Sequence, residues 1–318
     1  MSSLTITSKN RAKARAGAGR RPGSTAPRSQ NRRGWAYVAP TAAVLLILFV
    51  APIIVVIIMA CSRWTLLGGS QGVNFPDNFT KVFSNPLLGT SIWFTVKYTV
   101  LTTVILMPIA YGLALLVQES RHWNSILRTA ILVPSALGIA SASLLFYALY
   151  SPQVGPINSI LEKIGSTEAG ASILGTPNGA LWAIILLVVW RFAGYYMLLT
   201  MVGLQAIPGD VYEAAKLDGA GRLRPLSSIT IPLLKPTIAM TMIMSVTGSL
   251  LAFDQFYILT KGGPNNSTMT IVQLIYRDAF ETRKDLGMAA ALSVLLLLAL
   301  VIINLVQLRA MRFDSDSK

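Results

Sequence analysis

Long runs of apolar residues alternate with shorter polar segments along this chain. No Asp, Glu, Lys or Arg occurs from Gly34 to Ser62 or from Leu286 to Leu308. A helix that crosses the roughly 30 Å hydrocarbon core of a bilayer needs about 20 apolar residues, because each residue adds 1.5 Å. The pattern therefore predicts an all-α, polytopic membrane protein with six transmembrane helices. The six segments are Trp35–Ala60, Ser91–Val117, Thr129–Tyr150, Ala180–Gln205, Ile231–Leu259 and Gly287–Leu308.

The composition agrees with a membrane protein and excludes several other classes. The chain has 318 residues, of which 53% are hydrophobic and 13% are charged, and its mean hydropathy is +0.58. Soluble domains carry about 25% charged residues. Cys61 is the only cysteine and His122 the only histidine. These counts argue against a disulfide framework and against a Cys-rich or His-rich metal site.

The basic charge is concentrated at the start of the chain. The net charge is +14, and nine of the 27 Lys and Arg residues lie in residues 1–34, where no acidic residue occurs. This composition predicts a disordered basic cytoplasmic tail that contacts anionic lipid, not a nucleic-acid-binding domain. A cleavable signal peptide is not expected, because the first apolar segment is far longer than a 7–15-residue signal core. Residues 35–312 form the predicted six-span membrane domain, and residues 313–318 form a short cytoplasmic tail.

The orientation follows from the positions of Lys and Arg, which are enriched in cytoplasmic loops. With the N-terminus inside, the cytoplasmic side holds 18 of these residues and the outer side seven. Both termini are then cytoplasmic, as is the loop of residues 206–230. Besides the nine in the tail, the inner set is Arg121, Arg128, Lys216, Arg222, Arg224, Lys235, Arg309, Arg312 and Lys318.

The loop between the fourth and fifth segments predicts a short helix. Asp210 is expected to cap its N-terminus and Glu213 to reach back, as in a capping box. Ala214, Ala215, Lys216 and Leu217 favour helix. Gly219 is expected to end the helix in a left-handed conformation. The small alanines would let another surface approach one side closely.

The spacing in this loop resembles the signature of permease subunits of ABC importers. Glu213-Ala214-Ala215 is followed by Gly219, Ile229 and then Pro232. Asp218-Gly219-Ala220 and the later Pro236 resemble the carbohydrate branch, the maltose-permease type. Ile231 replaces the usual Leu before the proline. Pro225 predicts an interrupted second helix, so docking is expected to rest on residues 211–218.

A second segment resembles the same sugar-permease branch. Residues 253–264 contain Leu259-Thr260-Lys261-Gly262-Gly263-Pro264, similar to the Leu-Thr-x-Gly-Gly-Pro sequence of that branch. Thr268, Ile275-Tyr276 and Ala279-Phe280 fit the same pattern. The resemblance extends over residues 35–312 and implies the type I ABC importer permease fold in the inner membrane.

This resemblance also implies a division of labour. The chain is expected to form half of a translocation pathway for a sugar that an extracytoplasmic solute-binding protein delivers. A second permease subunit is expected to form the other half, as a heterodimer. The chain contains no Gly-x-x-x-x-Gly-Lys-Ser/Thr sequence for binding phosphates. No cofactor and no enzymatic activity are therefore expected in this chain. ATP and magnesium are expected in separate ATP-binding cassette subunits, which dock on residues Asp210, Glu213, Ala214, Ala215, Asp218, Gly219, Ile229 and Pro232.

Three charged residues stand out well inside the predicted segments, where charges are costly. Lys97 and Asp254 lie at matching depths near the outer face, and Arg191 lies nearer the middle. The structural interpretation is an ion pair between Lys97 and Asp254 that fixes the register of two helices. The functional alternative is a polar wall for a hydroxyl-rich solute. The candidate pathway residues are Lys97, Trp190, Arg191, Tyr195, Tyr196, Asp254, Gln255 and Tyr257.

Other functions predict other features. A secondary transporter driven by an ion gradient predicts inverted repeats and carboxylates near the middle of the membrane. Asp254 is the only carboxylate well inside a segment. A membrane-embedded enzyme predicts a cluster of His, Asp or Glu. An ABC permease for glycerol phosphate or an amino acid remains an alternative, because Lys97 and Arg191 could face a phosphate.

Overall fold

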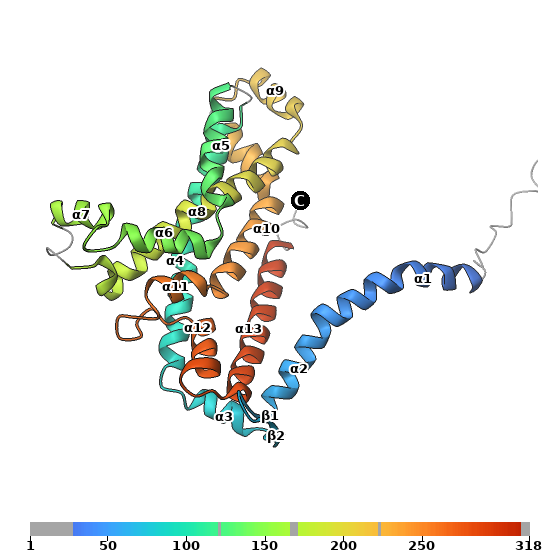
Figure 1. Cartoon of the computed structure of the whole chain (residues 1–318). Helices are drawn as coiled ribbons and strands as arrows, with labels where there is room; N and C mark the ends of the chain where they lie inside the picture. The colour runs from blue at the N-terminus through green and yellow to red at the C-terminus, as the bar shows by residue number, and fades with distance from the viewer. Residues whose placement is uncertain (1–27, 120–121, 166–170, 222–223, 313–318) are drawn as a thin grey trace, which may run out of the picture. The chain divides into compact units, whose positions relative to one another are not determined.

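The computed structural model describes residues 28–119, 122–165, 171–221 and 224–312, and these are predominantly helical (Figure 1). One two-stranded antiparallel hairpin interrupts the helices. The first half comprises α1 (Arg28–Leu45), η2 (Leu46–Val50), α2 (Ala51–Ala60), β1 (Ser62–Thr65), β2 (Gly69–Val73), α3 (Asp77–Phe83), α4 (Leu88–Val117), α5 (His122–Ala136), α6 (Ile139–Leu149) and α7 (Pro156–Lys163). The second half comprises η3 (Ile173–Gly175), α8 (Pro177–Gln205), α9 (Gly209–Leu217), η4 (Leu226–Thr230), α10 (Ile231–Leu250), α11 (Asp254–Leu259), α12 (Ile271–Tyr276), η5 (Arg277–Glu281) and α13 (Leu286–Arg312).

The six predicted segments correspond to membrane-length helices, two of which are broken. Five helical stretches are long and apolar enough to cross a bilayer, and the total is six if the bent pair of α5 and α6 is counted as one span. The segment predicted as one helix over Thr129–Tyr150 is in fact two helices that bend by 94°. The segment predicted over Ile231–Leu259 breaks between Leu250 and Asp254, where α10 ends and α11 begins.

The chain divides into two compact units, residues 1–54 and 55–318. In the first unit, α1 begins at Arg28, so it includes the last seven residues of the predicted tail. Residues 1–27 and 313–318 lie outside the described residues, and the predictions for these two tails stay predictions. The side chains described in this unit, from Tyr37 to Ile54, are almost all exposed. They are also strongly apolar, as a helix that meets lipid or another subunit requires.

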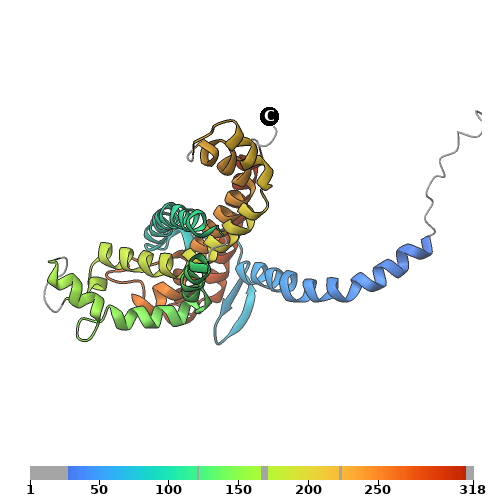
Figure 2. The same ribbon diagram turned by 90° about the horizontal axis from the view of Figure 1, so that it is seen from above.

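The core of the second unit lies where α4, α8 and α10 meet. One apolar cluster joins Ala114 and Val117 of α4 to Met197 and Met201 of α8 and Leu234 of α10. Another cluster brings together α4, α6, α8 and α11. The last three of these helices pack side by side in the second view (Figure 2). Close helix contacts of this kind replace the hydrophobic effect as the main source of cohesion in a membrane.

Polar interactions close one end of this unit, where the hairpin, α3 and η5 meet. Asn78 is fully buried, and its amide donates to the carbonyl oxygens of Ala60 (2.9 Å) and Ser62 (2.8 Å). The buried Asp278 accepts a 2.9 Å hydrogen bond from the Asn85 amide. Burial raises the pKa of Asp278, and the nearby arginines oppose this shift. The two Asn78 bonds satisfy carbonyl groups at the end of α2 and at the start of β1, whereas the Asn85 bond satisfies the buried carboxylate.

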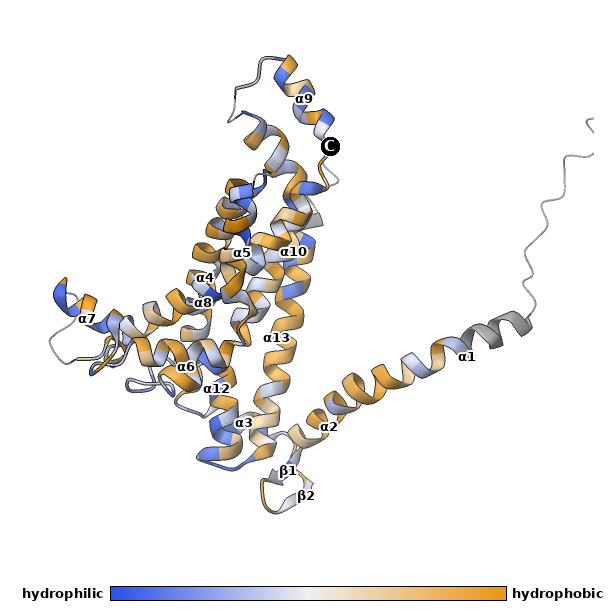
Figure 3. Cartoon of the chain, turned by 45° about the horizontal axis from the view of Figure 1, so that its top comes forward, coloured by the Kyte–Doolittle hydropathy of each residue, from blue (hydrophilic) through white to orange (hydrophobic). Residues whose placement is uncertain are grey.

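Apolar and hydrophilic residues are distributed over different helices of the second unit. Apolar residues dominate α8, α10 and α13, whereas hydrophilic residues gather on α3, α7 and α9 (Figure 3). Within the second unit, α9 lies at one end and the hairpin with α3 at the opposite end (Figure 1). An apolar middle with polar ends is the distribution expected for a bilayer-spanning bundle.

Candidate functional site: a surface helix and an internal cavity

The loop helix α9 ends as the sequence predicts. Gly219 has a φ of +76°, the left-handed conformation that favours glycine. Its N–H donates to the Lys216 carbonyl (3.1 Å), and the Ala220 N–H donates to the Ala215 carbonyl (3.0 Å). These two bonds form a Schellman motif, which satisfies the last carbonyl groups of a helix. The helix therefore stops sharply and presents a defined end.

The beginning of α9 differs from the predicted capping box. The residue before the helix is Pro208, in an extended conformation, and no side chain caps the N-terminus. Asp210 lies inside the first turn and not at the cap. The prediction that Asp210 and Glu213 form a capping box is wrong, because Pro208 starts the helix earlier than the Asp signal suggested. The Asp210 carboxylate still complements the positive end of the helix dipole.

Most of the signature residues of this loop are exposed. Asp210, Glu213, Ala214, Asp218 and Gly219 are exposed, and Ala215 is half-buried. The Glu213 side chain makes no hydrogen bond or ion pair with any described residue. An unpaired carboxylate beside two small alanines leaves a surface that a second protein can approach closely.

The N-terminal half of this helix is fastened to the membrane domain. The Tyr212 hydroxyl lies 3.0 Å from that of Thr230 in η4. Ile207, just before the helix, packs against the cluster that α4, α8 and α10 share. These two contacts connect α9 to η4 and to the helices of the core.

The segment after α9 corrects a second prediction. Pro225 does not interrupt a helix, since the chain is helical from Arg224 through η4 into α10. A proline is tolerated in a first turn, where its missing N–H has no helical partner. Ile229 and Pro232 are half-buried in this continuous stretch. Residues 222–223 lie outside the described part of the chain.

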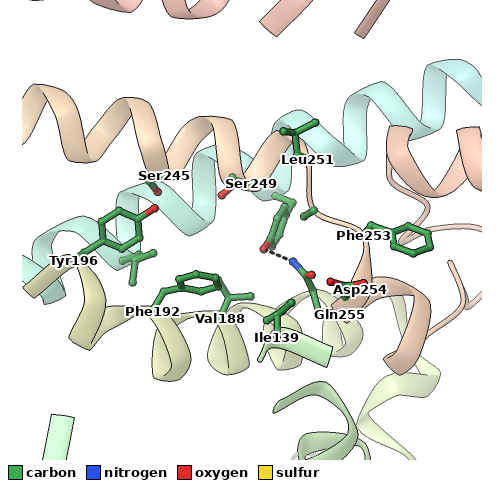
Figure 4. A pocket seen from close by; sticks show the side chains of 14 residues that line it. Ile139, Val188, Phe192, Tyr196, Ser245, Ser249, Leu251, Phe253, Asp254 and Gln255 are labelled. Carbon is green, nitrogen blue, oxygen red and sulfur yellow. Dashed lines mark hydrogen bonds between the residues drawn. The ribbon is translucent and has the colours of Figure 1, made fainter. Parts of the chain in front are cut away.

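The second feature is a cavity of about 270 Å³ inside the membrane domain (Figure 4). It lies between Val188, Phe192 and Tyr196 of α8 and Ser245 and Ser249 of α10. Both broken spans reach it. Ile139 is the first residue after the bend between α5 and α6. Residues 251–253 form the break between α10 and α11, and Asp254 and Gln255 follow in the first turn of α11.

Neutral polar groups and one carboxylate line this cavity. The Gln255 amide donates to the Tyr98 hydroxyl at 3.2 Å, the bond drawn in Figure 4. The Ser245 hydroxyl lies 3.3 Å from that of Thr103, and the Tyr196 hydroxyl points toward Ser245. Asp254 is the only carboxylate of the lining, and its side chain has no partner among the described residues. Ligand pockets commonly combine apolar walls with a few such polar groups.

The predicted pathway residues divide into two groups. Tyr196, Asp254 and Gln255 line the cavity. Lys97, Trp190, Arg191, Tyr195 and Tyr257 do not line it. The cavity also contains Tyr98, Ser245 and Ser249, which the sequence analysis missed. A stripe of Thr95, Tyr98, Thr99, Thr102 and Thr103 at helical spacing signals this inner face of α4.

The expected ion pair between Lys97 and Asp254 is absent from the described residues. Lys97 lies on the exposed side of α4, whereas its neighbour Tyr98 is almost fully buried. Consecutive helical residues point about 100° apart, so a match in depth does not bring two side chains together. The structural interpretation of this pair was therefore wrong.

The other predicted residues have structural contacts. The Arg191 Nε donates to the Leu137 carbonyl at 2.9 Å, and its guanidinium lies 4.2 Å from the centre of the Phe192 ring. Trp190 packs on Phe146, with ring centres 5.2 Å apart. Tyr195 contacts Tyr196 edge to face.

Tyr257 does not line the cavity, but it belongs to an aromatic group that includes the lining residue Phe253. It stacks on Phe253, with ring centres 5.2 Å apart, and contacts Tyr276 edge to face. Its hydroxyl donates to Glu281 at 3.3 Å. Among the described residues, no group of three His, Cys, Asp or Glu side chains could hold a metal ion.

Comparison with known proteins gives a consistent picture. The family model of the binding-protein-dependent transport system inner membrane component matches residues 106–312. The sulfoquinovosyl glycerol transport system permease protein of Agrobacterium fabrum is 32% identical over 277 residues, which cover 86% of this chain and 89% of that protein. The lactose transport system permease protein of Rhizobium radiobacter is 30% identical and covers 91% of this chain and 97% of its own.

Among solved structures, a chain of a bacterial ABC transporter involved in the import of the acidic polysaccharide alginate has a similar fold. The TM-score is 0.77 and the identity is 23%, and the match covers 91% of this chain and 98% of that one. The agreement extends over nearly the whole described membrane domain.

Proposed function

Because the chain belongs to the family of inner membrane components of binding-protein-dependent transport systems, we propose that it forms half of the pathway of an ATP-driven sugar importer. The relatives that support the word "sugar" are permease proteins whose names specify lactose and sulfoquinovosyl glycerol. A second permease subunit completes the pathway, and an extracytoplasmic binding protein delivers the sugar.

The observation that carries the proposal is α9. This helix is exposed, ends in a Schellman motif, and is fastened to the spans through the Tyr212–Thr230 hydrogen bond. A rigid helix with an unpaired Glu213 and small neighbours fits a groove in a cytoplasmic ATP-binding subunit. That subunit binds ATP and magnesium and hydrolyses the nucleotide. Its movement reaches the cavity through η4 and α10, because α10 carries Ser245 and Ser249.

The same proposal fixes the direction of the chain in the inner membrane. The α9 end is cytoplasmic, with both termini, and the end with the hairpin and α3 faces outward. The sugar passes through the cavity, where Tyr196, Ser249, Asp254 and Gln255 supply hydrogen-bonding groups to its hydroxyls. Such groups orient a polar ligand, while the apolar wall excludes competing water.

Site-specific photo-crosslinking tests the proposal in the assembled importer. A photoreactive residue at Leu217, which is 89% exposed on α9, should form an adduct with the ATP-binding subunit. The matched control is Leu67, which is 92% exposed in the hairpin region at the opposite end. It should give no such adduct. An adduct from Leu67 and none from Leu217 would refute both the docking site and the orientation.

A further inference from the structure

The bend between α5 and α6 is held by reciprocal hydrogen bonds to one residue of α8. The Ser135 hydroxyl, in the last turn of α5, donates to the Arg191 carbonyl at 2.8 Å. The Arg191 Nε donates back to the Leu137 carbonyl at 2.9 Å. The backbone of Arg191 thus binds the last turn of α5, and its side chain binds the residue that follows this helix.

The Leu137 carbonyl needs such a partner. Leu137 and Gly138 lie between the two helices, so this carbonyl accepts no backbone bond of a continuing helix. In a bilayer, a backbone group freed by a helix break must be satisfied by neighbouring protein or by water. An arginine is suited to this position, since its stem crosses apolar surface and its guanidinium donates in a fixed plane.

Close packing stiffens the same contact. Gly194 lies one turn after Arg191, and a Cβ there would collide with the carbonyl oxygen of Ile131 in α5. The two backbones therefore touch directly at this level. Hydrogen bonds at Ser135 and Leu137 next to a glycine contact leave α5 little freedom to slide along α8.

The two sides of this contact also form the cavity wall. Phe192, whose ring lies beside the Arg191 guanidinium, lines the cavity from α8. Ile139 lines it from the first turn of α6, two residues after Leu137. A change in the bend would move Ile139 relative to Phe192 and reshape the cavity.

We infer that Arg191 is a positioning residue for transport, which holds the bent span against α8 and thereby sets the cavity wall between Ile139 and Phe192. The role in transport rests on the proposed function, whereas the role in the bend does not. An alternative is that the guanidinium contacts an anionic solute directly. That role would leave the bend unchanged when the charge is removed.

The bend can be measured by electron paramagnetic resonance in the complete importer in nanodiscs. Spin labels at Val133 on α5 and Leu144 on α6, both well exposed, would report the distance across the bend in a Cys61→Ser background. Arg191→Met keeps the bulk but leaves the Leu137 carbonyl unpaired. This should raise the share of molecules with an altered bend roughly 5- to 150-fold and broaden the distance distribution.

Three further variants make the test specific. Ser135→Ala removes the reciprocal bond without changing any charge and should broaden the distribution in the same way. Arg191→Lys keeps a donor and should restore a narrow distribution. Lys97→Met removes an exposed cation of α4, which has no partner among the described residues, and should change nothing. An unchanged distribution in Arg191→Met would overturn the inference.

A second readout separates this inference from the proposed function. We expect Arg191→Met to keep basal ATP hydrolysis and to lose its stimulation by the binding protein. Normal stimulation together with a broadened bend would overturn the role of Arg191 in transport. The crosslink from Leu217 to the ATP-binding subunit should form in the wild-type importer and in Arg191→Met. Its absence from the wild-type importer would count against the proposed function and not against the role of Arg191.

Discussion

The C-terminal end of α9 offers a quantitative test, because Gly219 can be changed without creating a steric clash. Its φ of +76° is strained for any residue with a Cβ, yet nothing lies within 4 Å of the position that a Cβ would occupy. Gly219→Ala therefore isolates backbone strain. The left-handed conformation costs an L-residue roughly 1–2 kcal/mol, equivalent to about a 5- to 30-fold change in an equilibrium constant.

This strain should appear in docking of the ATP-binding subunit. The free loop can relieve the strain by unwinding its last turn, but a docked helix cannot. The Kd for the ATP-binding subunit, titrated onto the permease pair in nanodiscs, should thus rise by about 5- to 30-fold in Gly219→Ala. The Kd should rise less in Gly219→Asn, since Asn tolerates this conformation better than Ala. Gly219→Pro should abolish docking, because it fixes φ near −65° and removes the N–H that binds Lys216.

Gly221 supplies the matched control in the same loop. A Cβ there also meets nothing within 4 Å, and its backbone is not in the left-handed region. Gly221→Ala should leave the Kd unchanged, and membrane insertion should be normal in all four variants. Equal affinities for wild type and Gly219→Ala would refute the claim that this helix end is docked. Equal losses at Gly219 and Gly221 would point to general loop flexibility instead.

Other predictions concern the cavity and the outer end of the domain. Asp254→Asn removes a charged acceptor worth about 1.5–3 kcal/mol in a hydrogen bond, so the KM for uptake should rise at least tenfold while the protein remains folded. Tyr98→Phe leaves the buried Gln255 amide without its acceptor, which should lower the free energy of unfolding by about 1–3 kcal/mol, whereas Tyr195→Phe, on an exposed face, should not. Burial raises the pKa of Asp278 above its value in the unfolded chain. The wild type should therefore lose stability as the pH rises from the ordinary aspartate pKa to the raised one, and thermal unfolding of Asp278→Asn should lack this loss.

The sequence predicted the positions of the spans and the helix of the 206–230 loop, because both depend on local chemistry. Runs of apolar residues mark the spans, and a glycine after a helix-forming segment marks a left-handed end. The bend near Gly138 had visible signals in Pro134 and Gly138, although the predicted segment was drawn through them. Its partner, the Arg191 guanidinium, comes from another helix and could not be found by local reasoning.

The break between α10 and α11 has no such local signal. Residues 251–253 contain neither proline nor glycine. The Thr270 hydroxyl, 18 residues later, donates to the Ala252 carbonyl at 3.0 Å and stabilises the break from a distance. Cavity residues were missed for a related reason. Charged residues were predicted to line the pathway because charges are costly in a membrane. Lys97, however, is exposed on the surface of the bundle, whereas the neighbouring Tyr98 is buried inside it.

The source of energy for transport distinguishes an ATP-driven importer from an ion-coupled transporter most directly. Uptake of the sugar bound by the cognate binding protein should be measured in proteoliposomes that contain this chain, its partner permease and the ATP-binding subunits. Uptake should require ATP on the side of the membrane that carries the ATP-binding subunits. It should stop when the phosphate-binding lysine of these subunits is replaced, and it should persist when ionophores collapse all ion gradients. Uptake that survives the lysine replacement but disappears with the ionophores would contradict the account and indicate an ion-coupled transporter.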